Sequence, residues 1–180
     1  MDFYESSIKR FLYKEGNGRT YLAKNVMSTA RYKTLLQRFP DAKIIYIARH
    51  PYEVIPSTAS MFTLMYDRSI PKNAPPKKVW AQYALDFFRY SSEMRKTIPA
   101  KQFIAVKYDD LMQQPQQTVE KIYSHFNWIM DEPTQHALMQ EHSRAKHYKS
   151  GRQYSLEEYG FTRVEIKQHL KDEMDAFGFE

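Results

Sequence analysis

Arg49, Pro51 and Ser57 follow an apolar stretch that ends at Ala48, and their types and spacing suit the binding of an anion. The stretch is typical of a buried strand, and the Pro marks a turn before a helix that carries the Ser near its start. Ligands of open α/β sheets bind outside the carboxyl ends of the strands. A guanidinium and a hydroxyl meeting there are suited to hold a phosphate. An ordinary salt bridge of Arg49 is the alternative.

Further basic residues lie at two other places in the sequence. Lys24 ends a short expected strand, where it could stabilise negative charge or simply be solvated. Lys149 and Arg152 flank a Ser-Gly pair whose backbone N–H groups could also face an anion, although a solvated loop is the simpler interpretation. His50 directly follows Arg49 and should point away from it.

The composition indicates a folded protein and excludes several kinds of site. The 180 residues are 42% hydrophobic and 15% aromatic, which predicts a single domain over residues 1–180. Without any Cys, the chain has no disulfide, Cys-zinc site or Cys nucleophile. His142 and His147 lack a third ligand, so no metal is expected. No apolar run reaches the roughly 20 residues of a membrane span, and a cytoplasmic location is expected.

The charge is uneven along the chain. The net charge is +6, and residues 1–90 carry 15 Lys/Arg against 7 Asp/Glu, whereas residues 91–180 carry 12 against 14. The basic half contains Arg49, as expected for an anionic ligand. The basic residues are spread over several elements and match no recognition motif, which argues against a nucleic-acid binder.

Hydrophobic periodicity predicts strands that alternate with helices, and therefore a parallel α/β sheet flanked by helices. The strands are expected at 20–24, 43–48 and 102–108, the second buried on both faces. The helices are expected at 4–13, 28–38, 51–66, 77–96, 115–128, 133–141 and 162–177. Pro115 suits the first turn of the helix over 115–128. Thr162 and Glu165 form a capping box at the start of the helix over 162–177. In the helix over 77–96 the side chains expected to face inward are Val79, Trp80, Tyr83, Phe87 and Tyr90.

Several segments in order resemble the carboxyl-terminal part of sulfotransferases that use 3′-phosphoadenylyl sulfate (PAPS). Phe39 to Ser57 is similar to the segment of that family that binds the 3′-phosphate, with Ser eight positions after Arg. Val106 to Leu111 resembles its Tyr-Glu-Asp-Leu segment, and Tyr154 to Thr162 with Phe177 to Phe179 resembles the ending of one branch. The resemblance implies the P-loop NTPase-like sulfotransferase fold and sulfuryl transfer from PAPS to a hydroxyl or amine acceptor, which can be a small molecule, a glycan or a lipid.

The same resemblance implies roles for individual residues. Arg49 and Ser57 would bind the 3′-phosphate, Tyr108 would lie near the adenine, and Lys149 and Arg152 would close over the 3′-phosphate. Lys24 would act beside the transferred sulfuryl group. Tyr108 is equally understood as a packed aromatic at a strand end.

Two departures from the family weaken the catalytic interpretation. Where many members carry a His as general base, this chain has Val26 and Ser28, neither of which is a base near neutral pH. The Gly-rich loop that holds the 5′-phosphosulfate is also absent from the 180 residues, so the chain is expected to be truncated at its N-terminal side. A non-catalytic module that keeps only the 3′-phosphate half of the site is the alternative.

Overall fold

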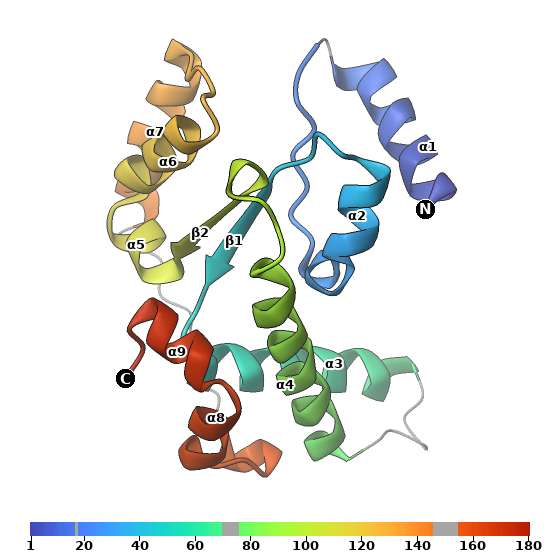
Figure 1. Ribbon diagram of the computed structural model, residues 1–180, viewed down its shortest axis with the longest axis vertical. Helices are drawn as coiled ribbons and strands as arrows, with labels where there is room; N and C mark the ends of the chain where they lie inside the picture. The colour runs from blue at the N-terminus through green and yellow to red at the C-terminus, as the bar shows by residue number, and fades with distance from the viewer. Residues whose placement is uncertain (17, 70–75, 146–154) are drawn as a thin grey trace. The chain divides into compact units, whose positions relative to one another are not determined.

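The computed structural model describes residues 1–16, 18–69, 76–145 and 155–180. Contacts group the chain into two compact units, Met1–Ala42 and Lys43–Glu180. The elements are labelled in Figure 1. The helices are α1 (Asp2–Phe11), α2 (Tyr32–Arg38), α3 (Pro51–Ser69), α4 (Lys77–Arg95), α5 (Tyr108–Gln113), α6 (Pro115–His125), α7 (Glu132–Ala145), α8 (Arg163–His169) and α9 (Lys171–Phe177), and the strands are β1 (Ile44–Ala48) and β2 (Phe103–Lys107). The single domain expected over residues 1–180 stays a prediction.

The first unit is helical. A π-helical turn, Leu12–Gly16, continues α1, and a 3-10 turn, Val26–Arg31, precedes α2. Arg38 of α2 pairs with the carboxylates of Asp2 and Glu5 on α1. These ion pairs join the two helices, beside an edge-on contact of the Tyr4 and Phe39 rings.

The prediction of a strand at 20–24 is wrong, because this stretch is irregular and exposed. A strand is stable only when its backbone groups pair with a neighbouring strand, and the described part of this unit supplies none. The helix expected from Ser28 instead begins as a 3-10 turn capped by Asn25, whose Oδ1 accepts a hydrogen bond from Met27 N at 2.9 Å. Asn caps a helix as well as Ser does, so the earlier residue takes the role.

The second unit contains a parallel pair of strands, β1 and β2, with Ile44 paired to Phe103 and Ala48 paired to Lys107. Tyr46 and Ala48 are buried, whereas Ile47 between them is 46% exposed. The expectation of burial on both faces is therefore wrong for β1. Successive side chains of a strand point to opposite faces, and only one face of β1 is well covered.

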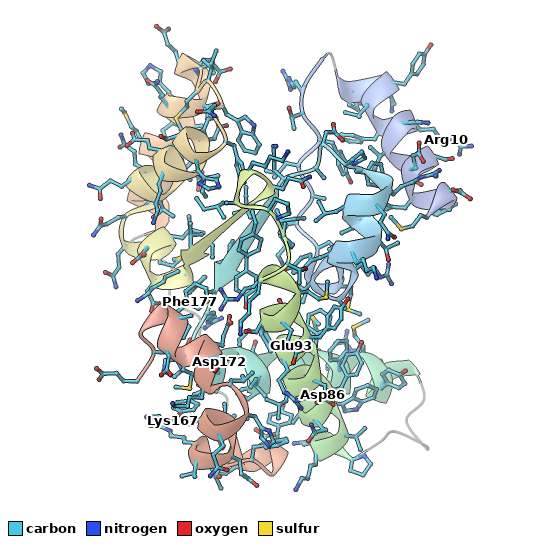
Figure 2. The ribbon with its side chains drawn as sticks, in the orientation of Figure 1. Arg10, Asp86, Glu93, Lys167, Asp172 and Phe177 are labelled. Atoms are coloured by element: carbon cyan, nitrogen blue, oxygen red, sulfur yellow. The ribbon has the colours of Figure 1, made fainter. Side chains whose placement is uncertain are left out.

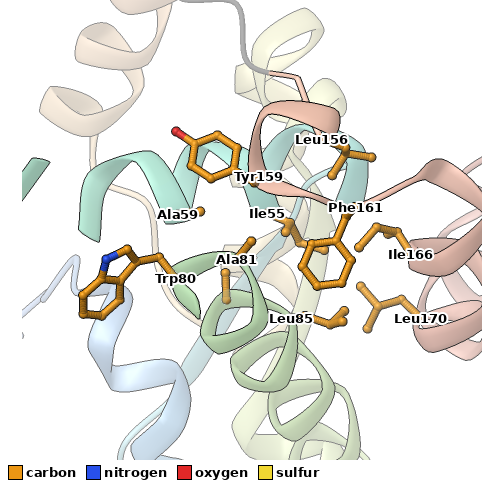
Figure 3. Close-up of a cluster of buried hydrophobic side chains, with 11 residues drawn as sticks. Ile55, Ala59, Trp80, Ala81, Leu85, Leu156, Tyr159, Phe161, Ile166 and Leu170 are labelled. Atoms are coloured by element: carbon orange, nitrogen blue, oxygen red, sulfur yellow. The ribbon is translucent and has the colours of Figure 1, made fainter. Parts of the chain in front are cut away.

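The core of the second unit lies where α3 and α4 pack against each other and against α8. Ile55 and Ala59 of α3 meet Ala81 and Leu85 of α4, and Ile166 of α8 joins them (Figure 3). A smaller cluster of Ile104, Val106, Ile122 and Phe126 joins β2 to α6. The described helices include none that is both long and apolar enough to cross a membrane.

The inward face of α4 was only partly predicted. Trp80 and Phe87 are buried as expected, but Val79, Tyr83 and Tyr90 are exposed. The buried positions that periodicity missed include Ala81, Ala84 and Leu85. Alanines let two helices approach closely, and the rings of Trp80 and Tyr83 pack further along α3 against Phe62.

The start of the expected helix over 162–177 agrees with its sequence signal, but its middle does not. Thr162 and Glu165 form the expected capping box, with Thr162 N donating to Glu165 Oε2 at 2.7 Å and Glu165 N donating to Thr162 Oγ1 at 3.2 Å. The single helix expected over 162–177 is divided at Leu170, which is buried and leaves the helical conformation with φ −122° and ψ 26°. The division separates α8 from α9.

Candidate anion site at the carboxyl ends of the strands

The structure brings Arg49 and Tyr108 together at the carboxyl edge of the sheet. Ala48 is paired with Lys107, so the residues that follow them leave the two strands side by side. The guanidinium carbon of Arg49 lies 4.7 Å from the centre of the Tyr108 ring. This is a cation–π contact, which fixes the plane of the guanidinium. The parallel pairing thus joins two residues that the sequence analysis singled out separately.

Arg49 is held from a second side by the first turn of α3. Its Nε lies 2.9 Å and its Nη2 2.8 Å from Oε2 of Glu53. The side chain of Arg49 is 36% exposed and that of Glu53 59% exposed. A guanidinium carries five N–H donors, and Glu53 accepts from only part of them, so the others stay available to a ligand.

Ser57 lies on the same face of α3 as Glu53, one turn further along. Residues four apart on a helix are neighbours, whereas Arg49 itself precedes α3. As expected, α3 begins at Pro51, and Ser57 lies near its start, in the second turn. Within the described residues its hydroxyl has no hydrogen-bond partner, and it remains free to donate to a ligand on this face.

His50 has a structural role and is not directed at the anion site. Its Nδ1 accepts a hydrogen bond from Tyr52 N at 3.2 Å, and its backbone oxygen accepts from Glu53 N and Val54 N at 3.0 Å each. His50 therefore caps α3. Its ring packs at a tilt against those of Tyr52 and Phe179, with centroids 4.6 Å and 5.1 Å away.

The remaining predicted residues fall in the first unit or outside the described residues. Lys24 belongs to the first unit, where it is exposed in an irregular stretch. Lys149 and Arg152 lie outside the described residues. Sequence reasoning missed Glu53, although its place four residues after Arg49 at a helix start was a usable signal.

The arrangement suits the binding of an anion. Arg49 and Tyr108 lie together at the edge of the sheet where α/β proteins bind ligands, and Ser57 lies on the adjoining α3. In the described part of the chain no three His, Asp or Glu side chains are grouped as a metal site would need. The described geometry suits a phosphate held by Arg49 and approached by Ser57.

Comparison with known proteins agrees with this geometry. The profile of the sulfotransferase family matches residues 1–132, which contain Arg49, Ser57 and Tyr108. The chain belongs to the sulfotransferase family. Among curated members it is 28% identical, over 167 residues, to the omega-hydroxy-beta-dihydromenaquinone-9 sulfotransferase Stf3 of Mycobacterium bovis and to that of Mycobacterium tuberculosis.

Solved sulfotransferases share the fold. The crystal structure of STF9 from Mycobacterium avium covers 85% of this chain with a TM-score of 0.67 at 23% identity. The sulfotransferase domain from the curacin biosynthetic pathway covers 92% with a TM-score of 0.52 at 17% identity. The expected P-loop NTPase-like sulfotransferase fold is thus confirmed. The chain corresponds to 42% of the length of Stf3 and 40% of that of STF9, so it spans less than half of these relatives.

Proposed function

We propose that this chain supplies the 3′-phosphate-binding part of a sulfotransferase that moves a sulfuryl group from PAPS to a hydroxyl or amine acceptor. The observation that carries the proposal is the Arg49 guanidinium, stacked 4.7 Å from the centre of the Tyr108 ring at the carboxyl edge of the sheet. Membership of the sulfotransferase family supports the same reading. Bound PAPS would supply the activated sulfuryl group.

The residues present fit the 3′-phosphate end of that donor. Arg49 offers the N–H groups that Glu53 leaves available, and Ser57 offers a hydroxyl on the adjoining helix face. Tyr108 would lie near the adenine, beside the guanidinium that its ring contacts. Lys149 and Arg152 belong to the proposal as residues that close over the phosphate, and Lys24 as the cation beside the sulfuryl group.

The first acceptor class to test is a hydroxylated isoprenoid lipid. The curated relatives are named for an omega-hydroxy-menaquinone acceptor, and their 28% identity supports a related acceptor without fixing it. A glycan or another small hydroxyl compound is the alternative acceptor. A cytoplasmic location is part of the same proposal, and fractionation of cells that produce the tagged protein tests it.

A calorimetric titration with adenosine 3′,5′-bisphosphate tests the binding half of the proposal. We expect Arg49→Ala to weaken binding about tenfold or more, since a hydrogen-bonded charge pair with the phosphate is lost. Adenosine 5′-monophosphate lacks the 3′-phosphate, so its binding should change little. Arg89→Ala is the matched control, because Arg89 is an exposed arginine that pairs with Asp86. Absence of binding to the wild type overturns the proposal.

A nucleotide-binding protein without transfer activity is the second candidate. It is favoured by Val26 and Ser28, which stand where many members of the family carry a His base. Transfer of labelled sulfate from PAPS to a hydroxylated isoprenoid lipid separates the two. Binding of adenosine 3′,5′-bisphosphate with no transfer to any acceptor supports this second function.

A further inference from the structure

The ring of Phe179 contacts the sequence neighbours of both residues of the anion site. His50 follows Arg49, and its ring centroid lies 5.1 Å from that of Phe179. Lys107 precedes Tyr108, and its Nζ lies 5.8 Å from the centre of the same Phe179 ring. One aromatic side chain thus packs beneath the two chain segments that carry Arg49 and Tyr108.

His50 transmits this contact to Arg49 through the start of α3. Because Tyr52 N is a donor, Nδ1 of His50 must accept its hydrogen bond, and the ring proton must be on Nε2. Nε2 then donates to the backbone oxygen of Glu180 at 3.0 Å. The imidazole therefore ties the end of the chain to the first turn of α3. That turn carries Glu53, which holds Arg49.

The segment that carries Phe179 is itself fixed to β1 and α4. Phe177 lies at the end of α9 (Figure 2), 6.1 Å from the Tyr46 ring and 4.9 Å from the Arg95 guanidinium. Gly178 then adopts a φ of +60°, a conformation that other residues rarely take, and this turns the chain back toward His50. The segment is thus a fixed support and not a free tail.

We propose that His50 and the segment Phe177–Glu180 act as a brace that positions Arg49 against Tyr108 and so sets the affinity for the 3′-phosphate. This inference rests on the proposed function. His50 and Phe179 are positioning residues, because they act through Glu53 and through the backbone of the two strands. Removing the Phe179 ring should loosen both segments at once.

The first test is the affinity for adenosine 3′,5′-bisphosphate of the full 180-residue chain, measured by calorimetry. We expect Phe179→Ala to weaken binding about fivefold at pH 7.5 and to leave adenosine 5′-monophosphate binding nearly unchanged. Phe3→Ala is the control for loss of a phenyl ring, since Phe3 is exposed on α1. Wild-type affinity for the bisphosphate with Phe179→Ala overturns the brace, and so does an equal loss for both nucleotides.

The second test replaces the imidazole of His50. His50→Asn keeps a good capping acceptor at the start of α3 but loses the ring that packs on Phe179 and the Nε2 donor to Glu180. We expect His50→Asn to weaken binding of the bisphosphate about threefold and to leave adenosine 5′-monophosphate binding nearly unchanged. Wild-type affinity for the bisphosphate with His50→Asn contradicts the proposed role of His50.

A third measurement decides the brace without any nucleotide. The Nε–H resonance of Arg49 should be displaced by the ring current of Tyr108, because the guanidinium lies over that ring. We expect Phe179→Ala to move this resonance toward the position of a free arginine, and Phe3→Ala to leave it in place. An unmoved resonance in Phe179→Ala overturns the brace. If the wild type binds no bisphosphate, the proposed function fails, and this resonance still decides whether the brace exists.

Discussion

Nε of Arg49 lies 2.9 Å from Oε2 of Glu53, so a carboxylate already occupies one edge of the guanidinium that we propose binds a phosphate. An i,i+4 ion pair at a helix start holds the guanidinium in place at little energetic gain, about 0.3–0.5 kcal/mol. The same carboxylate repels an incoming phosphate dianion. Glu53 thus both orients Arg49 and opposes its ligand.

Glu53→Gln should therefore tighten the binding of adenosine 3′,5′-bisphosphate. Gln keeps an oxygen that accepts from Arg49 but removes the negative charge, and we expect affinity to rise about two- to tenfold at low salt. The gain should shrink in 0.5 M salt, where screening is stronger. Calorimetry at the two salt concentrations checks this, with Glu93→Gln, distant on α4, as the control. Weaker binding by Glu53→Gln would show that orientation of Arg49 outweighs repulsion.

The parallel sheet could be predicted because it depends on local patterns. The apolar run before Arg49 predicted β1, and Phe103 to Lys107 lies within the strand expected at 102–108. A parallel pairing then requires both carboxyl ends to meet at one edge. The association of Arg49 with Tyr108 follows from the register of Ala48 with Lys107, which no local pattern reveals.

Other features depend on what packs nearby, and the sequence predicted them poorly. The segment 20–24 was expected to be a strand but finds no partner in the described residues, so it stays irregular. The exposed Tyr83 and Tyr90 looked like core residues, since periodicity alone cannot tell that the small Ala81 and Ala84 are the fully buried ones. The role of His50 depends on Phe179 and Glu180, which are far away in the sequence.

Arg95→Met should destabilise the second unit strongly. Arg95 Nη2 lies 2.7 Å from Oε2 of the buried Glu173, whose other oxygen accepts from Tyr46 Oη at 2.9 Å. Losing the cation leaves a buried, unpaired carboxylate. We therefore expect the free energy of unfolding to fall by about 3–5 kcal/mol in urea denaturation.

A neighbouring ion pair provides the matched control for this prediction. Lys96 Nζ lies 3.0 Å from Oδ2 of Asp172, and both side chains are largely exposed (Asp172 is labelled in Figure 2). Lys96→Met should cost only about 0–1 kcal/mol. Equal effects of the two substitutions would contradict the importance of burial, and Arg95→Met combined with Glu173→Met should recover much of the lost stability.

The capping box of α8 predicts a pH dependence of stability at acid pH. Hydrogen bonds from the backbone N–H of Thr162, and then from its hydroxyl, hold the pKa of Glu165 below its ordinary value of 4.5. A carboxyl whose pKa is lower in the folded state stabilises the fold above the pKa of the unfolded state, and this contribution disappears as the pH falls through the lower, folded-state pKa. Glu165→Gln removes this contribution. Its melting temperature should be below that of the wild type at pH 7 and approach it at pH 3, and a constant difference across this range would contradict the assignment.

Lys24→Ala tests whether the first unit takes part in sulfuryl transfer. If Lys24 stabilises charge on the transferred sulfuryl group, its loss should lower kcat about a hundredfold, the usual effect of removing one such donor. The affinity for adenosine 3′,5′-bisphosphate should stay unchanged, since that ligand carries no sulfuryl group. Lys33→Ala, an exposed lysine of α2 in the same unit, is the control and should retain full activity. Sulfate transfer from labelled PAPS measures the rate and calorimetry the affinity. A normal rate, or an equal loss of rate and nucleotide affinity, would remove Lys24 from the transfer step.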